Sequence, residues 1–229
     1  MPPARSSVDS AESLSWRGPF VALMRVLTAQ TRRGRPSLSR AEYEVVCEAL
    51  DREELIVYPT DTLYGLGGDP YTDRALDLVY RAKQRPRDEP IPLALASPGD
   101  VWTYGHATHL ARAFCVKHLP GPATVLLQAT PKAPAGLLST DGLVGIRVPD
   151  HPIAQAIAKA FGPITTTSAN LHGGPSPATC AEAVRQLGES VAVYVEAGPT
   201  RHGKESTIVD LSGASAKVIR EGVLRREDL

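Results

Sequence analysis

The apolar positions of this chain alternate between helical spacing and short continuous runs that are typical of buried strands. The clearest helix begins after Ser39, where Ser39 and Glu42 have the spacing of a capping box and apolar residues recur at helical intervals as far as Leu50. The run from residue 55 to 58 ends at Pro59, which predicts a buried strand. The same criteria predict helices at residues 73–81, 108–118, 152–161 and 176–187, and strands at residues 91–96, 124–129, 144–148, 164–167, 191–195, 207–211 and 217–220.

This alternation predicts one α/β domain with a mixed sheet, because no repeat and no linker interrupts residues 39–224. We expect the domain to occupy residues 38–229. Residues 1–37 are expected to form a poorly ordered N-terminal extension, since residues 1–40 carry seven arginines against two acids. A solvated leader is our interpretation of this basic segment, and an RNA-contacting tail is the alternative. The helix at 176–187 is expected to begin with Ser176 as its N-cap.

The charge and the cysteines narrow the class of protein. Lys and Arg total 25 and Asp and Glu total 25, so the zero net charge argues against coating of nucleic acid by bulk electrostatics. Cys47, Cys115 and Cys180 form no CxxC pair, which favours reduced thiols in a cytoplasmic protein. His109 and His118 flank Cys115, but helical geometry turns the three side chains apart, so no metal site is predicted. The longest early apolar run is too short to span a bilayer, and we expect no membrane contact.

Polar residues at the ends of the predicted strands carry the candidate chemistry. Thr60, Asp61 and Thr62 follow the first strand directly, and with Gly65 and Gly67 they could form the rim of a small-ligand site. A turn decorated with polar side chains is the alternative. The motifs of P-loop nucleotide binding, of serine hydrolases and of zinc proteases are absent, so covalent and metal-assisted hydrolysis are disfavoured.

Cations and hydroxyls recur at other strand ends. Lys83 and Arg85 are two residues apart in a segment expected to be extended, so both can face one anion. Arg147 lies in an apolar strand, where it requires an anionic partner or a position at the rim. The other members of this set, which end strands or precede glycine turns, are Thr166, Ser168, Asn170, Ser206 and Arg220.

Together these residues predict an anion-binding cleft without a strong nucleophile. Such a cleft suits reactions in which the substrate supplies the nucleophile and the protein supplies position and charge neutralisation, as in adenylation of a carboxylate or carbamate. Each motif alone also fits solvated charges or a structural ion pair. The residues by themselves therefore indicate a protein that binds small anions, with a nucleotide among the candidates.

The ordered set of motifs resembles the YrdC family of threonylcarbamoyl-adenylate synthases. The signature of that family is a KxR segment followed much later by SxN, here at residues 83–85 and 168–170. The other matching segments are PTDTLYGL at 59–66, PGPAT at 120–124, IRVP at 146–149, ESTIVD at 205–210 and IREG at 219–222. The resemblance implies a twisted α/β sheet with a concave, cationic groove, of the short single-domain type.

The resemblance also implies an activity. L-threonine, bicarbonate and ATP are condensed to threonylcarbamoyl-AMP with release of pyrophosphate, which is a nucleotidyltransferase reaction. Mg²⁺ is expected with the ATP, with Asp61 as the only candidate protein ligand. The product is handed to a tRNA threonylcarbamoyl-transferase complex that modifies the adenosine next to certain anticodons (t6A37), and a weak tRNA contact is a further expectation.

Residue roles follow from motif position in the resemblance. Lys83 and Arg85 are implied to be catalytic cations facing bicarbonate and the ATP phosphates. The residues implied to bind threonine are Thr62, Arg147, Thr166 and Ser206. The residues implied to bind ATP are Arg85, Ser168, Asn170 and Arg220.

One residue departs from the pattern. Glu89 precedes Pro90 where many members have Asn-Pro, and an acid would repel a triphosphate. We expect either that Glu89 points away or that the nucleotide contact of this position is lost. Two rival readings stay open: an RNA-binding module, and a paralogue of the same fold, either YciO-like without robust synthase activity or a carbamoyl-transfer domain of the hydrogenase-maturation type.

Overall fold

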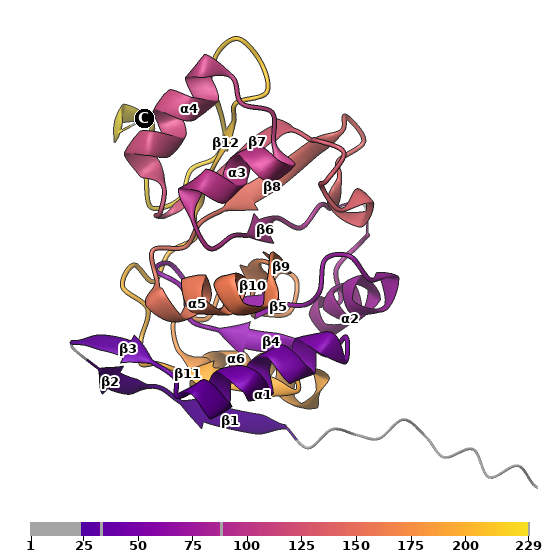
Figure 1. Cartoon of the computed structure of the whole chain (residues 1–229), viewed down its shortest axis with the longest axis vertical. Helices are drawn as coiled ribbons and strands as arrows, with labels where there is room; N and C mark the ends of the chain where they lie inside the picture. Colours follow the sequence, from indigo (N-terminus) through magenta and orange to yellow (C-terminus); the bar gives the residue numbers. More distant parts are fainter. Residues whose placement is uncertain (1–23, 33, 88, 229) are drawn as a thin grey trace, which may run out of the picture.

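The computed structural model describes residues 24–32, 34–87 and 89–228, whose strands form two mixed sheets and a hairpin (Figure 1). The five-stranded sheet has, in spatial order, β1 (Arg25–Thr28), β11 (Val193–Glu196), β4 (Ile56–Tyr58), β5 (Gly65–Gly67) and β10 (Thr167–Ser168). The six-stranded sheet has β13 (Lys217–Arg220), β12 (Thr207–Asp210), β7 (Ala123–Gln128), β8 (Leu143–Arg147), β6 (Leu93–Ala94) and β9 (Ile164–Thr165). The hairpin pairs β2 (Gln30–Arg32) with β3 (Arg35–Ser37). The predicted α/β class is confirmed, but the strands form two principal sheets instead of one.

The two sheets meet along one short segment of chain, residues 164–168. Its first half is β9, which pairs with β6, and its second half is β10, which pairs with β5. Thr166 lies between them and donates its N–H to Pro92 O over 2.8 Å. Thr165 exchanges two hydrogen bonds with Gly68, through its own N–H at 2.9 Å and through its hydroxyl oxygen at 2.8 Å. The strand predicted at 164–167 is therefore a connection shared by both sheets.

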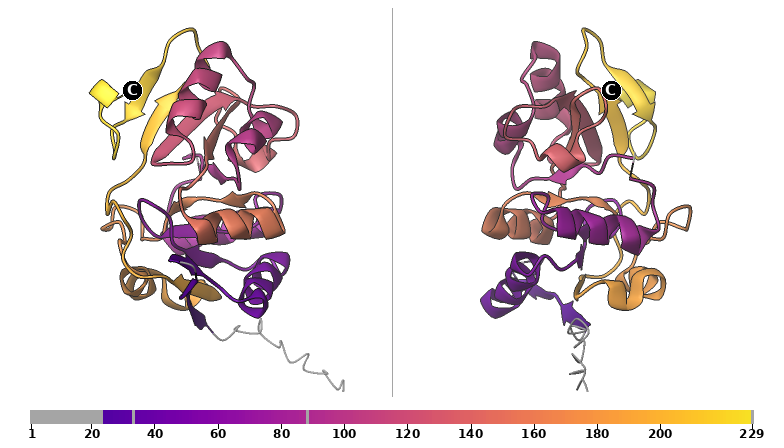
Figure 2. Two further views of the ribbon diagram at one scale, coloured as in Figure 1. Left: turned by 60° about the vertical axis from the view of Figure 1, so that its left-hand side comes forward. Right: turned by 90° about the vertical axis from the view of Figure 1, so that its right-hand side faces the viewer.

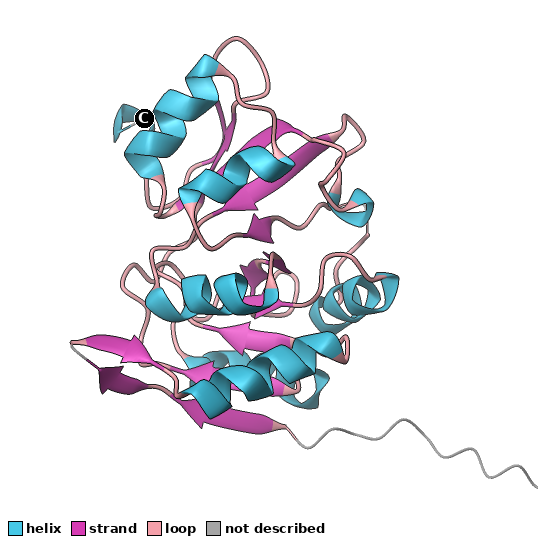
Figure 3. Cartoon of the chain, in the orientation of Figure 1, coloured by secondary structure: helices cyan, strands magenta, loops and turns pink. Residues whose placement is uncertain are grey.

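Helices cover the outer faces of both sheets (Figure 3). The helices are α1 (Arg40–Asp51), α2 (Asp73–Lys83), α3 (Val101–Tyr104), α4 (His109–His118), α5 (Pro152–Phe161) and α6 (Cys180–Leu187). The five-stranded sheet has helices on both of its faces, because alternate residues of β4 are buried against different helices. Ile56 and Tyr58 belong to the same buried cluster as Leu50 of α1 and Ile157 of α5, whereas Val57 faces the other cluster, which includes α6. Figure 2 shows α1 and α6 on opposite sides of that sheet.

Local capping signals explain where the helices begin. Ser39 caps α1 as predicted, because its hydroxyl accepts from Glu42 N and the Glu42 carboxylate accepts from Ser39 N. The predicted start of α6 is wrong. The helix begins at Cys180, because Thr179 and Glu182 form a complete capping box. Ser176 instead donates its hydroxyl to Glu205 over 3.1 Å.

The glycines at 65 and 67, predicted to belong to the rim of a ligand site, lie in strand β5, and of the two Gly65 lines the cavity between the sheets. Gly65 is the register partner of Tyr58. A Cβ at Gly67 would lie 2.9 Å from Cε1 of the Tyr58 ring. These glycines therefore serve close approach of an aromatic ring across the sheet and not a positive φ.

The N-terminal boundary also differs from the prediction. Residues 25–28 form β1 and pair in parallel with β11, so the domain begins before residue 38. Leu27 packs against the buried cluster beneath α1. This strand was not predicted from the sequence, because its apolar run is short and the surrounding segment is rich in arginine. Residues 1–23 of the expected extension lie outside the described residues.

The three cysteines are unpaired thiols. Across residues 24–32, 34–87 and 89–228, none of the helices has the length and apolar character needed to cross a bilayer.

Gly222 permits a backbone contact that holds the C-terminal segment beside Ser206. A Cβ at Gly222 would overlap the carbonyl oxygen of Glu205. Gly222→Ala is therefore expected to lower the free energy of unfolding by about 1–3 kcal/mol, as overpacking does. Gly213→Ala is the matched control, since nothing lies within 4 Å of that position. Denaturant unfolding of both variants checks this, and equal stabilities would contradict the steric argument.

Candidate functional site

A cavity of about 750 Å³ opens between the two sheets. Strands β5 and β10 line it from one sheet, and β7, β8, β12 and β13 line it from the other. The structure brings to this cavity all the residues implied to be catalytic or to bind threonine or ATP, which are Thr62, Lys83, Arg85, Arg147, Thr166, Ser168, Asn170, Ser206 and Arg220. The segments that carry them are far apart in the sequence, so the tertiary fold assembles the site.

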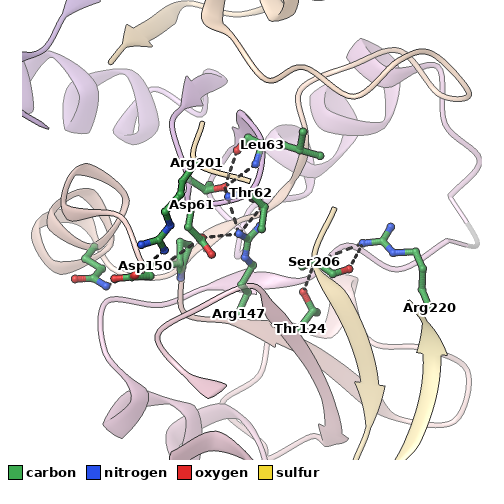
Figure 4. A network of polar contacts seen from close by, with 12 residues as sticks. Asp61, Thr62, Leu63, Thr124, Arg147, Asp150, Arg201, Ser206 and Arg220 are labelled. Atoms are coloured by element: carbon green, nitrogen blue, oxygen red, sulfur yellow. Dashed lines mark hydrogen bonds and ion pairs between the residues drawn. The ribbon is translucent and has the colours of Figure 1, made fainter. Parts of the chain in front are cut away.

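Arg147 ends β8 and is fixed by a buried polar network (Figure 4). Its Nη2 donates to Asp61 Oδ1 over 2.7 Å and to the Thr62 hydroxyl over 2.6 Å. The Thr60 hydroxyl accepts a third, longer bond of 3.2 Å. The side chains of Arg147 and Asp61 are 9% and 0% exposed. All these bonds leave from Nη2, and Nε is buried without a hydrogen-bond partner, while the residue as a whole lines the cavity.

Asp61 lies behind Arg147 and is not among the residues that line the cavity. Its Oδ1 also accepts from the backbone N–H of Asp150 at 3.2 Å. Its Oδ2 is buried without a hydrogen-bond partner. The carboxylate therefore orients the guanidinium of Arg147, and this placement contradicts the expectation that Asp61 is a magnesium ligand.

Lys83 ends α2 and is 2% exposed. Its Nζ donates to Ser168 O over 2.6 Å and to Asn170 O over 2.8 Å. Burial, and secondarily the charge of Arg85, lower the pKa of Lys83 to about 8. The KxR and SxN segments are thus in direct contact, which gives a physical reason for the two motifs to occur together.

Asn170 organises the loop that follows β10. Its side-chain amide donates to Leu171 O at 2.8 Å and to Gly174 O at 2.9 Å. Both amide hydrogens are therefore used within the loop. The residue lines the cavity, but its contacts shape the loop backbone.

Arg85 and Glu89 form an ion pair at the edge of the cavity. Arg85 Nε and Glu89 Oε2 are 3.0 Å apart, although the N–H is not aligned for a hydrogen bond. Nη1 of Arg85 donates to the Thr167 hydroxyl at 3.4 Å. His172 Nε2 lies 3.9 Å from the other carboxylate oxygen of Glu89. Glu89 therefore lines the cavity and pairs with Arg85. Its side chain does not point away from the site, which was one of the two expectations for this residue.

Ser206 and Arg220 form a second cationic corner (Figure 4). Nη2 of Arg220 donates to Ser206 O at 3.0 Å, and its Nη1 pairs with Glu205 at 2.9 Å. The Ser206 and Thr124 hydroxyls are 2.9 Å apart. Burial lowers the pKa of Arg220, with a smaller lowering contribution from the charges of Arg147 and Arg85. Three guanidinium groups therefore share this cavity, and each of them is paired with a carboxylate.

Several residues of the cavity were not predicted as contacts. Thr124 lies within the PGPAT segment, so its motif was a usable signal. Glu205 likewise begins the ESTIVD segment, so its motif was also a usable signal. His172 had no such signal, because its role depends on a side chain from another segment. Acids line the cavity as well as cations, namely Glu89, Asp141, Glu205 and Asp210 beside Lys83, Arg85, Arg147, Lys217 and Arg220. The expected cationic character of the groove therefore stays a prediction.

The fold and the site together define an α/β protein with a preformed cavity between two sheets, lined by lysine, arginine, hydroxyl, amide and carboxylate groups. The family model for Sua5/YciO/YrdC proteins, described as "Telomere recombination", matches residues 48–222. The chain belongs to this family, and the resemblance drawn from its motifs is confirmed.

Curated relatives of this chain are named as synthases. A "Putative threonylcarbamoyl-AMP synthase" of Mycobacterium tuberculosis is 37% identical over 184 residues, which span 78% of this chain and 83% of the relative. A "Threonylcarbamoyl-AMP synthase" of Vibrio cholerae is 37% identical over 180 residues, spanning 76% of this chain and 94% of the relative.

Two solved structures share the fold. Sua5 of P. abyssi, solved in complex with L-threonine, superposes with a TM-score of 0.81 at 25% identity, over 87% of this chain and 58% of that one. YciO of E. coli superposes with a TM-score of 0.78 at 27% identity, over 88% of this chain and 96% of that one. This chain thus spans little more than half of the Sua5 chain and nearly all of YciO.

Proposed function

We propose that this protein is an L-threonylcarbamoyladenylate synthase that condenses L-threonine, bicarbonate and ATP to threonylcarbamoyl-AMP and pyrophosphate. The observation that carries the proposal is the fixed, buried guanidinium of Arg147, which lines a cavity that Arg85 and Arg220 also line. A planar guanidinium matches the carboxylate of an amino acid. The named relatives support the same activity.

The residues divide between the two substrates. Arg147 binds the threonine carboxylate, and the hydroxyls of Thr62, Thr166 and Ser206 surround the amino acid. Arg85, Arg220 and Ser168 face the nucleotide. Among the described residues that line the cavity there is no cysteine, and no serine or threonine there hydrogen-bonds to a histidine, which agrees with a reaction that uses the substrate's own groups.

The reaction proceeds in two balanced steps. The amine of threonine attacks the carbon of bicarbonate, and loss of water leaves a carbamate. A carbamate oxygen then attacks the α-phosphorus of ATP, and pyrophosphate leaves with the bonding electron pair. Positioning and charge neutralisation by the protein favour both steps.

Magnesium is expected with ATP, as for most nucleotides. Among the residues that the structure describes, no three His, Cys, Asp or Glu side chains are grouped to hold a metal ion. We therefore expect Mg²⁺ to enter with the nucleotide, held by its phosphates and by no more than one or two carboxylates of the protein. Delivery of the product to a tRNA-modifying transferase complex, a weak tRNA contact and a cytoplasmic location remain predictions that follow from the family.

Pyrophosphate release is expected to require both co-substrates. ATP alone should give no release, and threonine with bicarbonate should start it. Serine should be a poor substitute, because one methyl group in a close-fitting site changes specificity by about 10- to 200-fold. A coupled pyrophosphate assay checks this, and release without threonine would contradict the synthase reading.

Lys83 gives nucleotide binding an expected pH dependence. A protonated ammonium attracts phosphates and a neutral amine does not, and the pKa of Lys83 is lowered to about 8. ATP affinity is therefore expected to be full below this pKa and to decline as the pH rises through it. Calorimetric titrations from about pH 7 to about pH 9.5 span the transition, since ordinary lysines remain charged there. If the ATP affinity of Lys83→Met falls just as steeply with pH, another group causes the decline.

A paralogous function is the second candidate, because YciO of E. coli is matched over 96% of its length. The same assay separates the two: a protein that binds ATP but forms no adenylate from threonine and bicarbonate would be YciO-like. An RNA-binding module would bind tRNA more tightly than ATP at physiological salt.

A further inference from the structure

The ammonium of Lys83 is already engaged by the protein. It donates to Ser168 O and Asn170 O and lies 3.5 Å from Asn170 Oδ1. An ammonium has three N–H donors, so these three oxygens account for all of them. We propose that Lys83 is a positioning residue that latches the 168–174 loop to the end of α2 and grips no reacting group itself.

Backbone and side-chain contacts close this latch from the loop side. His172 donates its N–H to Lys83 O over 2.7 Å, so both the amine and the carbonyl of Lys83 hold the same loop. Asn170 then ties the loop to itself through Leu171 O and Gly174 O. Lys83 is the last residue of α2, so the loop is anchored to a rigid helix end.

The latched loop forms one wall of the cavity. Ser168, Gly173 and Gly174 line the cavity from this loop. Lys83 therefore sets where the hydroxyl of Ser168 and the glycine backbone stand relative to a bound anion. Its charge also acts on that anion from a distance, through a low-dielectric wall.

Direct contact between Lys83 and a bound anion is the competing interpretation. It requires the amine to leave at least one of its buried acceptors, which would then lack a donor. Arg85 and Arg220 are better placed for contact, since their side chains are 18% and 42% exposed. In this proposal the buried Lys83 positions the wall of the cavity, and the more exposed Arg85 and Arg220 contact the ligand.

Hydrogen exchange of the ligand-free full chain tests the latch without reference to any activity. Lys83→Met is expected to speed exchange of the amides in residues 168–174 by about tenfold or more, because local opening becomes easier. Asn170→Ala should do the same, and the double variant should add little, since both changes release one latch. Arg220→Met removes a cavity cation from β13 and is the matched control, with unchanged exchange in this loop.

Lys83→Arg separates the latch from the charge. Arginine keeps the positive charge, but its planar donor group cannot replace a compact ammonium among three oxygens. We expect Lys83→Arg to speed loop exchange nearly as much as Lys83→Met, but to weaken ATP binding less because it keeps the charge. This variant decides the matter if Lys83→Met does not fold.

Two results would overturn the proposal. One is Lys83→Arg with wild-type loop exchange and wild-type ATP affinity. The other is Lys83→Met with unchanged loop exchange and lost ATP binding, which is the pattern of a direct ligand contact. The proposal rests on the proposed function only in its ATP measurement. If the protein lacks synthase activity but Lys83→Met still speeds exchange in the loop, the proposed function is refuted and the positioning role of Lys83 is retained.

Discussion

Arg147→Ala is expected to abolish threonine use and to destabilise the fold. Losing one partner of a buried, hydrogen-bonded charge pair costs about 3 kcal/mol of binding, which corresponds to roughly a 100-fold fall in kcat/KM for threonine. The change also leaves the Asp61 carboxylate buried without its cation. That orphaned charge should lower the free energy of unfolding by about 3–5 kcal/mol. Pyrophosphate release at varied threonine and denaturant unfolding measure the two effects.

A second variant separates substrate binding from folding. Asp61→Ala with Arg147→Ala removes both charges, so stability should recover in part while threonine use stays lost. Recovery of threonine use in this double variant would mean that Arg147 does not bind the carboxylate.

The chain offers a matched control for this ion pair. Arg201 and Asp150 are also 2.7 Å apart, but their side chains are 57% and 49% exposed. Arg201→Ala should therefore change stability by less than about 1 kcal/mol. An effect as large as that of Arg147→Ala would show that burial is not what makes the inner pair important.

Arg85→Ala and Glu89→Gln are expected to change ATP affinity in opposite directions. In the proposed function Arg85 meets the phosphates, so its loss should weaken binding by about tenfold or more, as expected for a charged hydrogen bond. Glu89 pairs with Arg85, and we expect its negative charge to repel phosphate. Removing its charge should tighten ATP binding roughly fivefold, the equivalent of about 1 kcal/mol. Isothermal titration calorimetry measures both changes.

A double-mutant cycle tests whether the two residues act through each other. In an Arg85→Ala background, Glu89→Gln should have little further effect on ATP affinity, because the pair is already broken. If Glu89→Gln weakens ATP binding in the wild-type background, Glu89 is itself a nucleotide contact and the repulsion argument is wrong.

Local signals made most of the fold predictable. The helices α1, α2, α4 and α5 carry their own caps and periodic apolar faces, and they lie within a few residues of their predicted positions. Strand β1 was missed because its partner β11 is far along the chain and its own run is short and basic. Sheet order and the division into two sheets also depend on such distant pairings, which no local pattern contains.

The cavity residues were predictable by type but not by contact. Arg147 was expected to need an anion, and the structure supplies Asp61, whose identity required the fold. The acceptors of Lys83 are mainly backbone carbonyls, which every residue carries, so the sequence does not reveal them. The pairing of Glu89 with Arg85 depends on side-chain conformation in the loop after α2.

The shared segment 164–168 limits how the protein can capture a ligand. Two layers joined only by loops could swing apart like a clamshell. Here such a movement would break the hydrogen bonds of Thr165 to Gly68 and of Thr166 to Pro92. These neighbouring residues belong to one short segment, but their partners adjoin different sheets. The span of the binding chamber is therefore set before any ligand arrives, and entry and release depend on side chains and loops at its mouth.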